Sequence, residues 1–233
     1  AAYRQSSHWR TDLAERDPQN KLLARQSRLR LDSVIVRDVA LSAAGLLTNV
    51  LGGPSVFPPQ PEGVYDFTQD PKNWKAATGA DRYRRGMYTH FWRSAPYPAL
   101  TIFDAPNGNV TCTRRIRSNT PLQALTLAND EAFVECVQSM GQRVVAEAPA
   151  DPVARAEYAF RLCLSRAPTA AEREALAQIA RQVTENFTKD LAAAKVLLPK
   201  GLESLSDSQA AELATAISLC RVILNLDEMI TRE

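Results

Sequence analysis

Three arginines lie just ahead of a predicted helix start: Arg114, Arg115 and Arg117 precede the pair Thr120-Pro121. Threonine is a good N-cap residue, and proline suits the first helical position. The free N–H groups and the dipole of a helix N-terminus favour anions, and a guanidinium binds carboxylates through two parallel hydrogen bonds. The segment could therefore bind an anion, or it could be held in place by carboxylates of its own chain.

Polar and apolar neighbours of these arginines support two interpretations. In the first, Asp38, Asp104 and Asn119 join them in a buried network, with Asp104 paired to an arginine and Asn119 capping backbone groups. In the second, the same side chains form a ligand site for an anion. We favour the structural network, because Ile116 and Leu122 indicate that the segment is buried. Asp38 belongs to a charged pair, Arg37-Asp38, on a predicted buried helix, and we expect its partners after Cys112.

Aromatic residues gather in the section before the arginines, and Tyr88, Trp92 and Tyr97 are candidates for an aromatic surface. Aromatic faces beside arginine, aspartate and asparagine can bind sugars, acidic polysaccharide or a partner protein. Alternatively, these rings form a small core of their own within a loop-rich section. We favour the small core.

Few residues of the chain are typical of catalysis. There are two histidines, His8 and His90, and the sequence lacks a nucleophile elbow, a paired-histidine metal motif, a phosphate loop and a dinucleotide fingerprint. The four cysteines have neither paired nor metal-type spacing, and there is no Cys-x-x-Cys-His motif for haem c. The sequence therefore identifies no catalytic residue, and we predict no cofactor and no metal in this chain.

Composition and charge narrow the class of protein. With 233 residues and 45% hydrophobic residues, the chain can bury a substantial core, and no apolar run is long enough for a membrane span. Residues 1–120 hold 17 basic and 10 acidic side chains, whereas residues 121–233 hold 11 and 16. The net charge of +2 disfavours nucleic-acid binding, and the two halves are expected to face each other electrostatically.

The predicted fold is mainly α-helical, with three parts. A central helix, capped by Asp32 or Ser33, is expected to run to Leu51. An irregular section rich in proline and aromatic residues follows, with short strands predicted over 86–92 and 99–103. The chain is expected to divide into residues 1–119 and a helical bundle over 120–233, within one continuous domain.

Local signals place the helices of the predicted bundle. The first should begin at Pro121, with Gln123 completing a capping box at Thr120, and continue to about Ala146. Further starts are predicted by Asp151-Pro152 and by two more capping boxes, Thr169 with Glu172 and Ser206 with Gln209. The third helix should extend to about Leu197.

Residues 112–130 read Cys-Thr-Arg-Arg-Ile-Arg-Ser-Asn-Thr-Pro-Leu-Gln-Ala-Leu-Thr-Leu-Ala-Asn-Asp, and this motif resembles the signature of a planctomycete-specific domain of unknown function. Other stretches that match in order are Tyr3–Ser7, Arg30–Asp32, Arg37-Asp38, Gly52–Val56, Pro58–Gly63 and Phe103–Pro106. The resemblance covers most of the chain. In that family the domain follows cytochrome c-type modules.

The resemblance implies the C-terminal part of an extracytoplasmic multidomain protein, with haem c carried on a separate upstream domain. The leading expectation is a non-catalytic scaffold or binding module for carbohydrate or a partner domain, either upstream in the same protein or on another chain. The alternative is part of an oxidative or hydrolytic enzyme acting on polysaccharide, with some catalytic groups supplied by a missing upstream region. Because the chain opens inside a family motif, we expect it to lack a portion that packs against residues 1–50.

Overall fold

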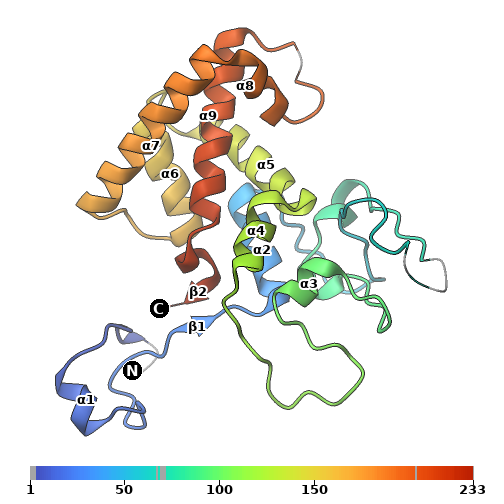
Figure 1. The fold of residues 1–233 in the computed structure, drawn as a ribbon, viewed down its shortest axis with the longest axis vertical. Helices are drawn as coiled ribbons and strands as arrows, with labels where there is room; N and C mark the ends of the chain where they lie inside the picture. Colours follow the sequence, from blue (N-terminus) through green and yellow to red (C-terminus); the bar gives the residue numbers. More distant parts are fainter. Residues whose placement is uncertain (1–3, 67, 69–71, 203, 233) are drawn as a thin grey trace.

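A computed structural model describes residues 4–66, 68, 72–202 and 204–232. The protein is mainly α-helical, as predicted (Figure 1). Its helical body contains α2 and α4 to α9. The N-terminal segment with the short helix α1 (Asp12–Arg16) and the irregular section between α2 and α3 lie beside this body.

Helix α2 (Ser33–Ala44) buries much of its surface, including Val36, Ala40 and Leu41. It is shorter than predicted. Gly45 ends it with a left-handed backbone (φ 74°), and its N–H bonds to the carbonyls of the last turn. This conformation is easy for glycine and stops a helix. The predicted extension to Leu51 is therefore wrong, whereas the helix itself lies against α5 in the core.

The section from Leu46 to Tyr97 has little regular structure. Its described residues include two 3₁₀ turns, η2 (Gly79–Tyr83) and η3 (Gly86–Tyr88), and the section leads into the short helix α3 (Pro98–Ile102). Neither predicted strand forms. Helix α3 occupies most of the strand predicted over 99–103, and η3 occupies the start of the strand predicted over 86–92. Within the section, Val56 makes an isolated bridge to Thr89: its N–H donates to Tyr88 O and its carbonyl accepts from His90 N, both at 2.8 Å. Proline at the first turn of α3 explains why a helix forms there.

The predicted helix from Pro121 is two helices, α4 (Pro121–Asn129) and α5 (Glu131–Glu147). Asp130 separates them with an extended backbone, and its carboxylate accepts a bond from Ala132 N at 3.0 Å. A carboxylate in this position caps the following helix. Asp190 separates α7 (Ala170–Lys189) from α8 (Leu191–Leu197) and caps α8 in the same way.

Two further helices complete the body, α6 (Pro152–Leu164) and α9 (Asp207–Leu224). Three predicted helix starts are confirmed: Asp151 caps α6, and complete capping boxes open α7 at Thr169 and α9 at Ser206. The box predicted at Thr120 is wrong, because that side chain makes no capping bond.

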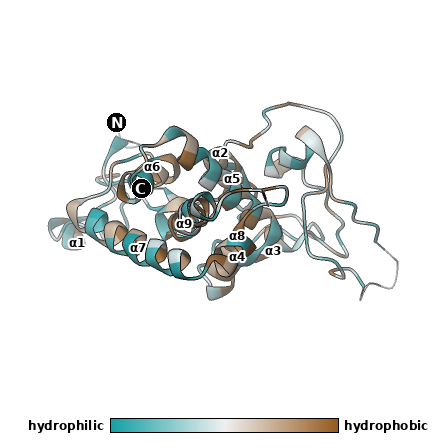
Figure 2. Ribbon diagram, turned by 90° about the horizontal axis from the view of Figure 1, so that it is seen from above, coloured by the Kyte–Doolittle hydropathy of each residue, from teal (hydrophilic) through white to brown (hydrophobic). Residues whose placement is uncertain are grey.

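Helix α9 lies at the centre of the bundle, with α5, α6, α7 and α8 against it (Figure 2). Its approach to α5 is close at Gly141. A Cβ on this glycine would lie 2.6 Å from Cγ1 and 3.0 Å from the backbone N of Ile217. Gly141 therefore lets the two helices pack almost backbone to backbone.

A short sheet joins the segment before α2 to the segment after α9. Strand β1 (Leu29–Arg30) pairs antiparallel with β2 (Thr231–Arg232), which follows the 3₁₀ turn η4 (Asp227–Ile230). The turn is also held to the bundle, because Arg166 bonds to Glu228 and to Glu172 at distances of 2.6–2.9 Å. The residues before α2 are thus joined to those after α9.

Candidate functional site

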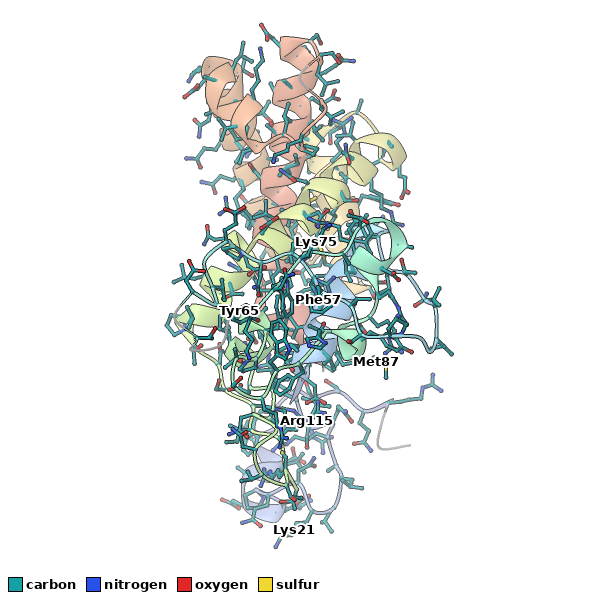
Figure 3. The ribbon with its side chains drawn as sticks, turned by 90° about the vertical axis from the view of Figure 1, so that its right-hand side faces the viewer. Lys21, Phe57, Tyr65, Lys75, Met87 and Arg115 are labelled. Atoms are coloured by element: carbon teal, nitrogen blue, oxygen red, sulfur yellow. The ribbon has the colours of Figure 1, made fainter. Side chains whose placement is uncertain are left out.

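We call residues 111–117 the arginine loop. It lies in the long connection between α3 and α4, which extends away from the helices (Figure 1). Figure 3 shows Arg115 set apart from Phe57 and Tyr65, toward the end of the molecule where Lys21 lies. The whole loop is exposed, and Ile116 has 77% of its surface accessible to solvent. The burial predicted from Ile116 and Leu122 is wrong, because both side chains face solvent.

The carboxylate of Asp32 forms ion pairs with two guanidiniums of the arginine loop. Arg115 Nη1 lies 3.4 Å from Asp32 Oδ2, and Arg117 Nη2 lies 3.3 Å from Asp32 Oδ1. Arg114 forms neither an ion pair nor a hydrogen bond within the described part of the chain. The loop is therefore only partly neutralised. Asp32 occupies the N-cap position of α2 but makes no side-chain capping bond.

Asp104 does not pair with an arginine, which corrects that prediction. Its backbone is left-handed (φ 62°), and its carboxylate accepts from Ser118 N at 2.7 Å and from the Ser118 hydroxyl at 2.8 Å. Gln123 Nε2 donates to the Ile102 carbonyl at 2.9 Å, and its amide oxygen accepts from Arg30 at 2.8 Å. These bonds fix both ends of the connection that carries the arginine loop.

Asn119 lies at the edge of this network. Its Oδ1 accepts from Arg30 Nη2 at 3.3 Å, so it contacts a side chain and does not cap backbone groups as predicted. Arg30 reaches Asp227 with its other terminal nitrogen at 2.9 Å. The connection is thereby linked to strand β1 and, through Arg30, to the turn η4.

The partners predicted for the Arg37-Asp38 pair are wrong. Asp38 is buried, and its carboxylate accepts from Arg85 Nε at 2.8 Å and from Gly86 N at 2.6 Å. Arg37 donates to the carbonyl of Arg82 at 2.8 Å. Both charged groups of α2 therefore hold the irregular section, and the arginine loop lies elsewhere.

The aromatic candidates separate into a packed cluster and a lone ring. Tyr97 is 2% exposed and stacks on Trp74 at 5.3 Å, so it is not a surface residue. Burial raises its pKa well above the ordinary value. Trp92 is half-buried and packs edge-on against Trp74 and Tyr65, at 5.7 and 5.4 Å.

Tyr88 is half-buried beneath the guanidinium of Arg84, 3.9 Å from the ring centre, and its hydroxyl accepts from Gly52 N. His90 stacks on Phe57 at 4.6 Å, and its Nδ1 lies 2.9 Å from Ser55 Oγ. These contacts match the interpretation of the rings as a small core.

A hollow with a volume of 460 Å³ lies beside the arginine loop. Asp104 and Arg115 line it, but Tyr88 and Trp92 do not, so the structure does not bring these four into one pocket. Exposed apolar side chains stand close by in the sequence: Val110, Ile116, Leu122 and Leu125. The site is thus basic and partly apolar, without the aromatic walls expected from the sequence.

Sequence reasoning missed Asp32 and Ser118. Asp32 was interpreted only as a candidate helix cap, so its pairing with Arg115 and Arg117 was not predicted. No group of three or more histidine, cysteine, aspartate or glutamate side chains could hold a metal ion among the residues described. Within the same residues, no helix is long and apolar enough to cross a membrane.

These features define a mainly α-helical domain that presents a basic loop from a packed framework. The chain belongs to the PSD1 family, described as a protein of unknown function (DUF1553), whose family model matches residues 1–180. The resemblance to a domain of unknown function is thereby confirmed. Searches of curated proteins and of solved structures found no match.

Proposed function

We propose that this chain is a non-catalytic binding module that uses the arginine loop to hold an acidic surface of a partner domain. The partner would be an upstream domain of the same protein or a separate chain. The expectation of an extracytoplasmic, cytochrome-associated protein forms part of this proposal and rests on the family resemblance.

The observation that carries the proposal is the uneven charge of the arginine loop. The loop has three exposed guanidiniums: Arg115 and Arg117 share the single carboxylate of Asp32, and Arg114 has no partner in the described residues. Guanidiniums bind carboxylates in a planar, two-bonded geometry, and an uncompensated basic patch attracts an acidic partner over a distance of about 8 Å in physiological salt. An acidic surface would complete the charge balance of the loop.

Exposed apolar side chains favour a protein partner over carbohydrate. Ile116 lies between the arginines with 77% of its surface exposed, and Val110 has 74% exposed. Protein interfaces combine arginine with buried apolar anchors, and burying an isoleucine side chain stabilises a complex by about 1.5–3 kcal/mol. The rings of Trp74, Trp92 and Tyr97 are turned toward one another, which leaves less open aromatic surface for a sugar.

The test uses a synthetic glutamate-rich peptide containing two leucines, with polygalacturonate and neutral dextran as competing probes. We expect the peptide to bind most tightly and its affinity to fall as salt rises. Arg114→Gln and Ile116→Ser should each weaken peptide binding, and the pair together by about tenfold or 1.4 kcal/mol. Calorimetric titration measures each affinity.

Arg181→Gln is the matched control, since Arg181 is an exposed arginine on α7, away from the loop. It should bind the peptide like the wild-type protein. Tighter binding of either polysaccharide, or equal weakening by Arg114→Gln and Arg181→Gln, would refute the proposal.

A further inference from the structure

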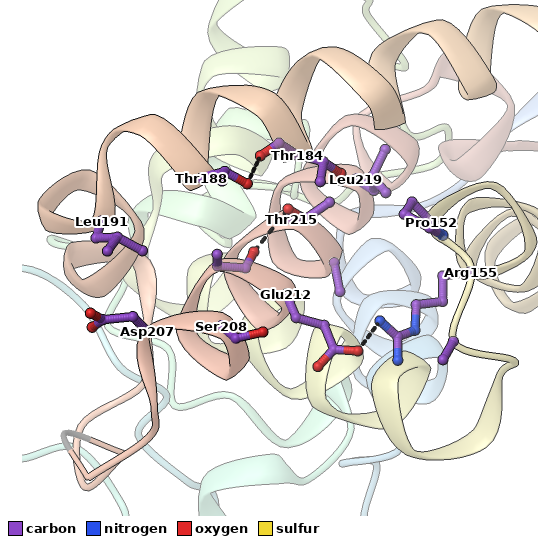
Figure 4. A pocket seen from close by; sticks show the side chains of 13 residues that line it. Pro152, Arg155, Thr184, Thr188, Leu191, Asp207, Ser208, Glu212, Thr215 and Leu219 are labelled. Atoms are coloured by element: carbon purple, nitrogen blue, oxygen red, sulfur yellow. Dashed lines mark hydrogen bonds and ion pairs between the residues drawn. The ribbon is translucent and has the colours of Figure 1, made fainter.

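A second hollow lies within the C-terminal bundle, far along the chain from the arginine loop. It is walled by α6, α7 and α9 with the start of α8, and has a volume of 440 Å³ (Figure 4). Sites for small organic ligands are typically about 300–1,000 Å³. The lining combines aliphatic surface from Leu191 and Leu219 with hydroxyl and charged groups.

Three threonines of the lining present acceptors to this pocket. Thr184 donates its hydroxyl hydrogen to the carbonyl of Ala180, and Thr188 donates to that of Thr184, both at 2.8 Å. Thr215 donates to the carbonyl of Ala211 at the same distance. A hydroxyl has one hydrogen, so each oxygen keeps only lone pairs for a ligand. The threonines therefore favour a ligand that donates hydrogen bonds.

A buried arginine fixes a carboxylate in the wall. Arg155 is 6% exposed, and its Nη1 lies 2.7 Å from Glu212 Oε1 (Figure 4). Within the described chain, no other residue pairs with the Glu212 side chain, so its second oxygen is available. Asp207 adds a second carboxylate, 2.8 Å from Lys195. Each of these charged groups therefore already has one partner, and the second oxygen of Glu212 is the one that remains for a ligand.

From this lining we infer that the pocket binds a small organic amine, with its ammonium on Glu212 and the threonine oxygens and its hydrocarbon part on Leu191 and Leu219. An ammonium offers three donors and no acceptor, which complements a wall of acceptors. A charge-assisted bond to a carboxylate is about twice as strong as a neutral one. The arginine loop is basic and would repel the same ligand, so the two sites select opposite charges.

An anionic ligand fits this pocket poorly. It would have to displace Glu212 from Arg155, and the freed carboxylate would lose its partner. The geometry therefore separates amines from carboxylates of the same size.

The test compares three probes of one chain length, hexylamine, hexanol and hexanoate, by calorimetric titration of the full chain. We expect hexylamine to bind, with hexanol and hexanoate at least about tenfold weaker, a difference of 1.4 kcal/mol. Thr188→Val keeps the shape but removes an acceptor, and should weaken hexylamine binding severalfold. Thr188 is exposed at the pocket rim, so this variant should fold normally.

Glu212→Gln should abolish hexylamine binding, and Glu185→Gln should not, since Glu185 is an exposed carboxylate of α7 outside the pocket. If Glu212→Gln fails to fold because Arg155 loses its partner, Thr188→Val alone decides. The proposal is overturned if hexanoate binds as tightly as hexylamine, if no probe binds, or if Thr188→Val binds hexylamine like the wild-type protein.

Discussion

At Gly86 the irregular section packs tightly against the backbone of α2, and replacing this glycine should separate the two. A Cβ there would lie 2.4 Å from the carbonyl oxygen of Val34 and 2.9 Å from its Cα. Both atoms belong to the helix backbone, which cannot rotate away as a side chain can. The amide of Gly86 and the guanidinium of Arg85 also hold the carboxylate of Asp38. Gly86→Ala must therefore move the segment and stretch both bonds.

The expected loss of stability follows from these contacts. Overpacking a tight site costs about 1–3 kcal/mol, and a hydrogen bond to a charged group contributes about 1.5–3 kcal/mol. We expect the free energy of unfolding to fall by about 3–5 kcal/mol for Gly86→Ala. For a chain of this length each kcal/mol lowers Tm by about 2–4 °C, so Tm should fall by about 10 °C.

Circular dichroism during urea unfolding measures this effect. The far-ultraviolet signal follows the helices, and the near-ultraviolet signal follows the packed rings of Trp74 and Trp92. The near-ultraviolet signal of Gly86→Ala should be lost at lower urea than in the wild-type protein. Met87→Ala is the control, because Met87 is exposed beside the glycine. An unfolding midpoint of Gly86→Ala equal to that of Met87→Ala would refute the reasoning.

Two further predictions concern titration and thiol reactivity. Hydrogen bonds from Arg166 lower the pKa of Glu172 from 4.5 to about 2, so this carboxylate contributes stability above pH 4.5 that is lost as pH falls toward 2. Glu172→Gln should flatten the decline of Tm over that pH range, and an unchanged decline would contradict this assignment. Cys112 is exposed, whereas burial raises the pKa of Cys136 and Cys163 to about 12 and that of Cys220 well above its ordinary value. Ellman's reagent should therefore titrate one thiol in the folded protein and four after unfolding, and rapid reaction of more than one folded thiol would contradict the structure.

Helix starts could be predicted because their signals are local. Asp151, Thr169 and Ser206 each accept a bond from a backbone N–H three residues away, so the sequence around each one contains the whole interaction. The break at Asp130 escaped prediction because apolar periodicity continues across it. Helical spacing alone does not show that a carboxylate will end one helix and cap the next.

The side-chain network was harder to predict because its partners lie far apart in the sequence. Asp38 bonds to Arg85, and Asp32 lies against Arg115 and Arg117, across separations that no local pattern spans. The sequence identified the arginines of the loop as candidate site residues, but it did not predict that the loop is exposed. Isoleucine is typical of a protein core, so Ile116 indicated burial. The pocket beside Arg155 could not be predicted from the sequence, because alanines and threonines on helices are typical of ordinary helix packing.

The pairing of β1 with β2 has a consequence for synthesis on the ribosome. Leu29 and Arg30 leave the ribosome before the helices of the bundle, but their partners Arg232 and Thr231 emerge only after those helices. Until then this edge of the nascent chain has unpaired backbone groups, which other strands can join. The sheet can therefore form only at the end of translation. Chaperones that shield extended segments would act on the residues before α2.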